Sequence, residues 1–106
     1  MKSLEDRQKG FEAEFKRNQE LAFRVTARRN RLFGLWAAEK LEMPAYQHEA
    51  YARTVVEADF ERPGDSDVLE KVQKDFAGKG IAITELQLRA EFERAATEAK
   101  RQLMQG

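Results

Sequence analysis

Three helix-breaking sites constrain the fold of this chain more than any other feature of its sequence. Each is built from proline or glycine, and together they comprise Pro44, Pro63, Gly64, Gly78 and Gly80. Proline lacks a backbone N–H and clashes with the preceding turn in a helix interior, so the first helical segment should end near Glu42. Pro44 can open the next helix, because proline is accepted at the first helical position. The breaks therefore leave helical segments at residues 3–42, 44–62, 66–78 and 84–104.

Each segment carries apolar residues at the spacing of an amphipathic helix. In the first segment the predicted core positions are Leu21, Val25, Leu32 and Trp36, flanked by Phe23, Ala27, Leu35 and Leu41. In the second they are Tyr51, Ala52, Val55, Ala58 and Phe60. In the third they are Val68, Leu69, Val72 and Phe76, and in the fourth Leu88, Phe92, Ala95, Ala96, Ala99 and Leu103. Connections of a few residues make consecutive helices antiparallel neighbours, so the patterns predict an all-α fold, an antiparallel four-helix bundle.

Capping signals support two of these boundaries. Thr84 and Gln87 have the spacing of a capping box at the start of the fourth helix. Asp67 and Glu70 have the same spacing, so Asp67 is predicted to cap the third helix, with Asp65 as the alternative.

The first segment is longer than its neighbours can cover. As one helix from Ser3 to Glu42 it would extend about 60 Å at 1.5 Å per residue. The other segments have about 13 to 21 residues and would cover about half of that length. We therefore expect one domain, residues 1–106, in which residues 19–106 form the bundle. Residues 1–18 should form an N-terminal arm that projects beyond the bundle or is partly disordered.

The predicted arm has one narrow apolar stripe among charged residues. Leu4, Phe11 and Phe15 form the stripe, and Gly10 interrupts it at a cost of about 1 kcal/mol relative to Ala. Burying the stripe would contribute roughly 5 to 8 kcal/mol before the entropy of ordering the segment is subtracted. Two interpretations stay open: the phenylalanines fold back on the bundle as a lid, or the arm docks as a helix in a groove of another protein.

Composition argues against several classes of function. The chain has no cysteine, which excludes disulfides and thiolate metal sites. It has one histidine, His48, which we expect on the surface, so a His-based zinc site or a Ser-His-Asp triad is improbable. The formal net charge is zero, whereas nucleic-acid-binding proteins usually carry a basic surplus. No uncharged run approaches the roughly 18 to 20 residues of a membrane span. We expect a cytoplasmic protein that is no enzyme, requires no cofactor or metal, does not insert in the membrane and is monomeric when free.

Charge is strongly segregated along the neutral chain. Residues 19–38 carry a net +3, and the following 32 residues carry a net −6. In a hairpin of the first two segments, the residue numbers of two facing positions add up to about 87, because the turn lies near residue 43 or 44. This places Arg28 opposite Asp59 and Arg31 near Val56 and Glu57. The basic and acidic runs should then neutralise each other within the molecule.

The arginine cluster of residues 19–38 comprises Arg24, Arg28, Arg29 and Arg31. Of these, Arg24 and Arg29 fall on sides of the predicted helix that do not face the acidic run. Guanidinium groups bind phosphates and carboxylates through paired hydrogen bonds, so these residues could bind a phosphate or an acidic partner. The glycine-bearing stretch FAGKGIAIT at residues 76–84 lacks the P-loop spacing and follows no predicted strand, so it is a weak candidate for holding phosphate.

Four stretches occur in a specific order along the chain: EDRQKGFEAEF, ARRNRLFGLWAAEKL, YARTVVEADFERPGDSDVLEKV and LQLRAEFE. Taken together they resemble the zeta-subunit family, the inhibitor subunit of alpha-proteobacterial F-type ATP synthases. The resemblance covers essentially the full length. Its most specific part is the run from Arg28 to Ala38, followed by Asp59-Phe60 and by Pro-Gly-Asp at residues 63–65.

The resemblance implies a function for the arm. Members of this family are four-helix bundles with a mobile N-terminal arm. In inhibitory members the arm enters a catalytic α/β interface of the F1 sector as a helix and blocks rotation in the direction of ATP hydrolysis. The implied partners are thus the α/β interface and γ. Carried onto this chain, residues 1–18 are the inhibitory arm, and its partner-binding positions are Leu4, Asp6, Arg7, Phe11 and Phe15.

The resemblance also implies an alternative function. Members are reported to bind ADP or ATP on the bundle, so the chain could be a nucleotide-binding regulatory bundle with weak or no inhibitory activity. Arg28, Arg29 and Arg89 are the candidate nucleotide-binding residues, because phosphates need cationic donors. One departure concerns potency: Gly10 stands where a strong inhibitor of the family has Ala, which predicts a less helical arm and weaker inhibition.

Overall fold

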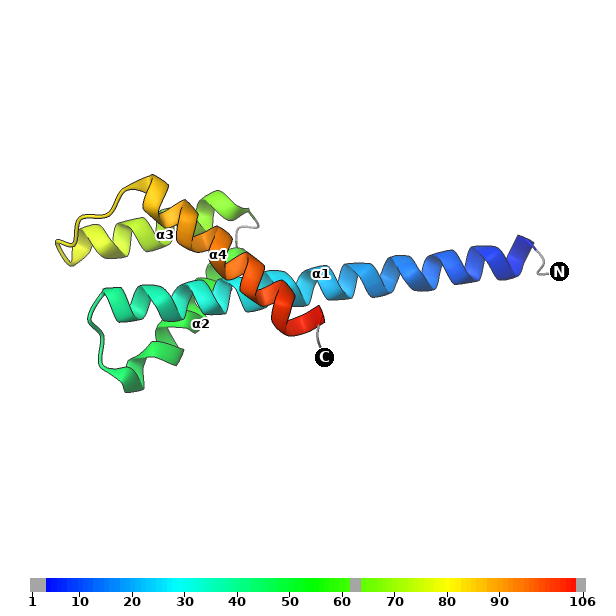
Figure 1. Ribbon diagram of the computed structural model, residues 1–106, viewed down its shortest axis with the longest axis horizontal. Helices are drawn as coiled ribbons and strands as arrows, with labels where there is room; N and C mark the ends of the chain where they lie inside the picture. The colour runs from blue at the N-terminus through cyan, green and yellow to red at the C-terminus, as the bar shows by residue number, and fades with distance from the viewer. Residues whose placement is uncertain (1–3, 62–63, 105–106) are drawn as a thin grey trace.

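The computed structural model describes the backbone of residues 4–61 and 64–104 and the side chains of residues 18–61 and 64–104. Its helices are α1 (Leu4–Lys40), the short 3-10 helix η1 (Ala45–Gln47), α2 (His48–Glu61), α3 (Asp65–Gly78) and α4 (Glu85–Met104). Consecutive helices run in opposite directions (Figure 1). The predicted all-α, antiparallel four-helix bundle is confirmed.

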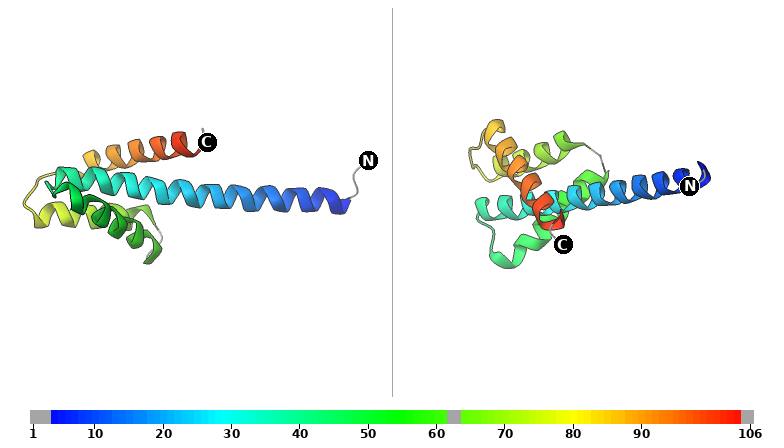
Figure 2. Two further views of the ribbon diagram at one scale, coloured as in Figure 1. Left: turned by 90° about the horizontal axis from the view of Figure 1, so that it is seen from below. Right: turned by 45° about the vertical axis from the view of Figure 1, so that its right-hand side comes forward.

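The long helix α1 is the central element of the molecule. In Figure 2, α4 lies on one side of α1, while α2 and α3 lie on the other. Most contacts of α1 are with α2 and α4, whereas α3 packs mainly against α2. The core between the helices is apolar, and its most deeply buried members are Phe33, Ala37, Ala38, Leu41, Ala52, Val55, Val68, Val72, Phe76, Leu88 and Ala99.

The N-terminal half of α1 extends away from the other helices (Figures 1 and 2). α1 has 37 residues, and the molecule measures 65 × 25 × 22 Å along its principal axes. The expected projection of the arm is therefore observed for its backbone from Leu4 onward. The alternative in which this segment folds back as a lid is not seen in the described backbone.

The end of α1 is close to the predicted position. Glu42 has a left-handed backbone with φ 60°, and the Met43 N–H donates to the Ala38 carbonyl at 3.1 Å, which satisfies an otherwise unpaired carbonyl of the last turn. Pro44 was predicted to open the second helix, but it precedes η1 instead. His48, expected on the surface, is half-buried, and its Nε2 lies 2.8 Å from the Met43 carbonyl oxygen.

The two predicted caps had different outcomes. The capping box of α4 is confirmed, because the Thr84 N–H donates to Gln87 Oε1 at 2.9 Å and the Gln87 N–H donates to Thr84 Oγ1 at 3.0 Å. The predicted cap of α3 is wrong. Gly64 occupies the cap position without a side-chain hydrogen bond, and Asp65 and Asp67 lie inside the first turn instead. There their negative charges favour the positive end of the helix dipole.

The buried side of α1 differs from the predicted one. Leu21, Val25, Leu32 and Trp36 are only half-buried, whereas the buried positions are Asn30, Phe33, Gly34, Ala37, Ala38 and Leu41. The reason is a close approach of two helices: a Cβ added to Gly34 would lie 2.7 Å from the Ala52 Cα on α2. Such a crossing requires small residues, which a search for large apolar residues does not mark.

α2 also departs from its predicted core pattern. Tyr51, Ala52 and Val55 are buried as expected, but Phe60 is 61% exposed. α2 diverges from α1 toward its C-terminal end (Figure 2), so Phe60 lies outside the packed part of the helix pair. In α3 all four predicted core residues are buried. In α4 Leu88, Phe92, Ala95 and Ala99 are buried as predicted, whereas Ala96 and Leu103 are only half-buried.

Candidate functional site at the exit of the long helix

The candidate site lies where α1 leaves the bundle. Here α1 and α2 diverge, and Phe23 on α1 meets Phe60 on α2 edge to face, with ring centroids 5.5 Å apart. Residues 4–22 of α1 precede this contact and span about 28 Å at 1.5 Å per residue. The site therefore comprises a free helical arm and the surface from which it emerges.

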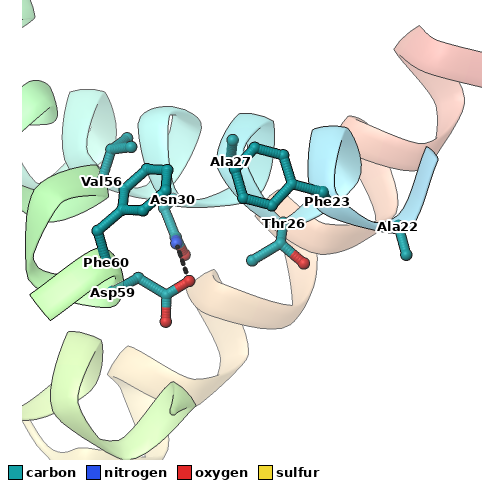
Figure 3. Close-up of a pocket in the computed structure, with 8 residues that line it drawn as sticks. All are labelled: Ala22, Phe23, Thr26, Ala27, Asn30, Val56, Asp59 and Phe60. Atoms are coloured by element: carbon teal, nitrogen blue, oxygen red, sulfur yellow. Dashed lines mark hydrogen bonds between the residues drawn. The ribbon is translucent and has the colours of Figure 1, made fainter. Parts of the chain in front are cut away.

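An asparagine inside the bundle connects α1 to α2 at this exit. Asn30 is 1% exposed, and its Nδ2 donates to Asp59 Oδ2 at 3.1 Å, as Figure 3 shows. Its Oδ1 accepts a hydrogen bond of 3.1 Å from Arg29 Nε. Asp59 in turn accepts a hydrogen bond of 3.3 Å from the Gly64 N–H through Oδ1. A buried amide with both ends hydrogen-bonded is stable in a core, and this one fixes α2 and the following turn against α1.

Arg29 extends the same connection to α3 and α4. Its guanidinium carbon lies 4.2 Å from the centre of the Phe92 ring on α4, a cation–π contact. Its Nη2 lies 3.0 Å from Asp65 Oδ1, and the Arg29 side chain is only 12% exposed. This nitrogen forms no directed hydrogen bond among the described residues, so its contact with Asp65 is mainly electrostatic. Arg29 thus has a structural position inside the bundle rather than a surface position.

The other arginines of the cluster have partners that the hairpin register did not predict. Arg28 does not face Asp59, because its Nη1 donates to the neutral Gln102 Oε1 of α4 at 2.7 Å. Arg31 lines a hollow with Val56, as predicted, but its ion partner is Glu49, at 2.6 Å. The register is offset by two positions, because Asn30 and not Arg28 lies beside Asp59.

A largely apolar groove opens between the diverging helices. It has a volume of about 380 Å³ and is lined by Ala22, Phe23, Thr26, Ala27, Asn30, Val56, Asp59 and Phe60 (Figure 3). The Asn30–Asp59 hydrogen bond is part of this lining, and both aromatic side chains are more than half exposed. The groove was not predicted, since Phe23 and Phe60 were assigned to the core.

Comparison with known proteins identifies the family. The family model of ATPase inhibitor subunit zeta matches residues 1–102. This chain belongs to that family. It is also similar to a structure determined by NMR in solution, with 46% sequence identity and a TM-score of 0.68 over 78% of this chain and 94% of the other. No curated protein sequence matches it.

The zeta-family motif positions of the arm lie on α1. Leu4, Asp6, Arg7, Phe11 and Phe15 all fall within its helical range, but their side chains are outside the described part of the chain. Their roles in partner binding therefore stay predictions. The structure gives the backbone on which they are carried, a helix without a break up to Lys40.

The three predicted nucleotide-binding arginines of this zeta-family chain are not brought together. Arg89 forms an ion pair of 3.0 Å with Glu85 at the start of α4, whereas Arg28 bonds to Gln102 near its end. These two α4 positions are about 25 Å apart along the helix axis at 1.5 Å per residue. Arg29 lies inside the bundle, as described. A single phosphate group could not contact all three guanidinium groups in this arrangement.

A carboxylate on α4 positions the partner of Arg28. Gln102 Nε2 donates to Glu98 Oε1 at 3.1 Å, and Arg101 donates to both oxygens of the same carboxylate. The hydrogen bonds from Arg101 and then from Gln102 lower the pKa of Glu98 to about 2. Because Glu98 accepts from the amide nitrogen of Gln102, the amide oxygen is left to accept from Arg28 and hold α4 against α1.

We also searched the described part of the zeta-family chain for metal-binding groups and membrane-spanning helices. Within residues 18–61 and 64–104, no group of three His, Cys, Asp or Glu side chains is arranged to hold a metal ion. Within the described residues, none of the helices has the length and apolar character needed to cross a membrane.

Proposed function

We propose that this chain inhibits ATP hydrolysis by F-type ATP synthase by inserting the N-terminal part of α1 into a catalytic α/β interface of the F1 sector, toward γ. The inserted helix blocks rotation in the hydrolysing direction. The observation that carries the proposal is the length of α1, which continues as a helix about 28 Å beyond the point where the bundle stops covering it. A mechanical block of this kind requires no catalytic group.

The unbroken helix gives the inhibitor the rigidity that a block requires. Since α1 has no interruption between Leu4 and Lys40, the arm and the bundle share one axis. Asn30 and Arg29 fix that axis to α2, α3 and α4 through the contacts described above. A helix held in this way can oppose a moving rotor, whereas a flexible tether could only bind to it.

Helix geometry gives the arm a single side with which to bind. Positions 4, 11, 15, 22 and 26 follow one another at intervals of seven, four, seven and four residues. At 3.6 residues per turn these positions fall within about 60° of arc. The predicted stripe of the arm therefore continues into Ala22 and Thr26 of the groove. We infer that the catalytic interface receives the arm by this side.

The test compares ATP hydrolysis by purified F1 in the presence of the full chain and of a chain that starts at Gln19. We expect the full chain to inhibit and the shortened chain to leave hydrolysis unchanged. The shortening spares all described core residues, which lie at or after Asn30, and circular dichroism checks that the helices remain. Equal inhibition by both chains would exclude the arm as the inhibitory element.

Adenine-nucleotide binding is the second candidate function. Arg28 favours it, because its guanidinium bonds a neutral amide and contacts no carboxylate among the described residues, which leaves its charge available to a phosphate. Titration with ADP, followed by residue-resolved chemical shifts, should perturb residues 28–30 in both the full and the shortened chain. An undisturbed segment would exclude Arg28 and Arg29 from any nucleotide site.

A further inference from the structure

Two adjoining hollows mark the surface from which the arm emerges. One is the groove between α1 and α2 described above. The second has a volume of about 490 Å³, and α4 contributes Leu103 to its lining. Phe23, Ala27 and Val56 line both hollows, so they form one continuous surface. We call this surface the exit surface and define it by six of its residues: Phe23, Arg24, Ala27, Arg28, Val56 and Phe60.

The exit surface exposes two aromatic side chains in contact with each other. Phe23 is 56% exposed and Phe60 is 61% exposed, although their rings pack edge to face. Other exposed apolar side chains, such as Leu86 on α4, make no ring contact of this kind among the described residues. A pair of aromatic rings beside an open groove is typical of a protein-binding surface, because burying it on binding contributes strongly to affinity.

The same surface carries two arginines, Arg24 and Arg28, and the groove is also lined by Asp59, whose carboxylate accepts from the Asn30 amide and the Gly64 N–H. Arg31 is paired with Glu49, but neither Arg24 nor Arg28 contacts a carboxylate within the described part of the chain. Glu20, one turn before Arg24, lines a neighbouring hollow with it and forms no ion pair with it. Charge complementarity therefore favours an occupant that presents carboxylates beside an apolar side chain.

We propose that the exit surface is a second docking site for the F1 sector, and that it binds an acidic segment of F1 carrying an apolar side chain. The proposal rests on the proposed function, since the arm must first bring F1 to this place. Phe23 directly follows residues 4–22, so a partner that encloses the arm reaches the exit surface without a gap. The acidic segment would contact Arg24 and Arg28 while its apolar side chain enters the groove beside Phe60.

The apolar part of the proposal is tested with a matched pair of alanine variants of the full chain. Phe60→Ala removes an exposed ring of the exit surface, and Leu86→Ala removes an exposed apolar side chain of α4 that is 79% exposed. We expect Phe60→Ala to raise the Kd for F1 about tenfold. Leu86→Ala should leave the Kd within about twofold. Neither side chain is in the core, so both variants should fold.

The charged part is tested with two charge reversals. Arg24→Glu alters the exit surface, whereas Lys79→Glu makes the same change in charge at the end of α3, far from it (Figure 1). We expect Arg24→Glu to slow association with F1 about tenfold at low ionic strength, and the difference should shrink as salt is added. Lys79→Glu should associate like the unmodified chain.

The outcomes separate this proposal from the proposed function. If the full chain inhibits F1 but Phe60→Ala and Arg24→Glu bind with unchanged affinity and rate, the exit surface is no docking site and the arm acts alone. If the full chain does not inhibit F1, both proposals fail. Sedimentation of the free protein tests whether a second copy of this chain occupies the exit surface instead of F1. Self-association that Phe60→Ala abolishes, with unchanged binding to F1, would assign the surface to a second copy of this chain and overturn the proposal.

Discussion

Residues 30–40 and residues 4–22 of α1 belong to one helix, yet only the first range lies inside the bundle. The buried range has small residues at the contact with α2 and Phe33 facing α4, while the free range consists mostly of charged and polar residues and has one apolar stripe. A helix of about 19 residues is marginal alone in water because the first turn is costly to form. The packed half supplies that first turn, so the free half only has to be extended.

The largest expected effect comes from replacing a buried phenylalanine of α1 with alanine, compared with the same change where α1 leaves the bundle. Phe33 is fully buried and packs on Phe92, with ring centroids 5.2 Å apart, so Phe33→Ala should lower the free energy of unfolding by about 3–5 kcal/mol. Phe23→Ala, at the exposed exit, should lower it by less than about 1 kcal/mol. Denaturant unfolding followed by circular dichroism measures both values. Similar losses would mean that the bundle extends further along α1 than its burial indicates.

Alanine at Gly34 is the next largest change. The added Cβ would meet the Ala52 backbone at 2.7 Å, so Gly34→Ala should cost about 1–3 kcal/mol of unfolding free energy despite the better helix propensity of Ala. Gly78 is the control, because nothing lies within 4 Å of a Cβ there, and Gly78→Ala should be neutral or slightly stabilising. A stable Gly34→Ala variant would show that the helices can move apart at little cost.

The same substitution in the free half should have the opposite sign. Gly10→Ala should favour the helical arm by about 1 kcal/mol, equivalent to roughly fivefold tighter inhibition of F1 hydrolysis. The half-maximal inhibitory concentration measures the effect, with Gly78→Ala as a control that leaves the arm unchanged. Unchanged or weaker inhibition would count against arm folding as a limiting step.

The smallest effect concerns the attachment of α4 to α1 through Glu98. Its folded-state pKa of about 2 lies below the ordinary value of 4.5, so its ionised form stabilises the fold above pH 4.5 and this contribution is lost as the pH falls toward 2. Glu98→Gln should therefore be slightly less stable than the unmodified chain at neutral pH, and the difference should vanish near pH 2. Unfolding at several pH values tests this, with Glu93→Gln on the exposed side of α4 as the control. A pH-independent difference would indicate loss of packing instead.

Much of the fold follows from local sequence signals. The helix ends near residues 42, 64 and 80 depend on proline and glycine, and Gly80 indeed has a φ of 72° after α3. The core positions of α3 and four of the six predicted in α4 were predictable because each helix has one apolar side, marked by large residues such as Val72, Phe76 and Leu88. The projection of α1 followed from its length alone.

The candidate site was less predictable, because its determining residues are not apolar. Asn30 is the buried residue that aligns α1 with α2, and Gly34 allows the close approach, yet neither contributes to a hydrophobic pattern. Large residues on several sides of α1 instead suggested Leu21, Val25 and Trp36 for the core. Phe23 and Phe60 were misplaced for the related reason that periodicity cannot reveal where two helices diverge.

The uninterrupted axis of α1 has a mechanical consequence. A push on its tip acts through a lever of about 28 Å, so even a modest load produces a large turning moment at the root of the helix. The polar contacts of Asn30 and Arg29 are located close to that root and would bear the moment. Weakening them should let the rod swing under torque while leaving the resting shape of the molecule intact.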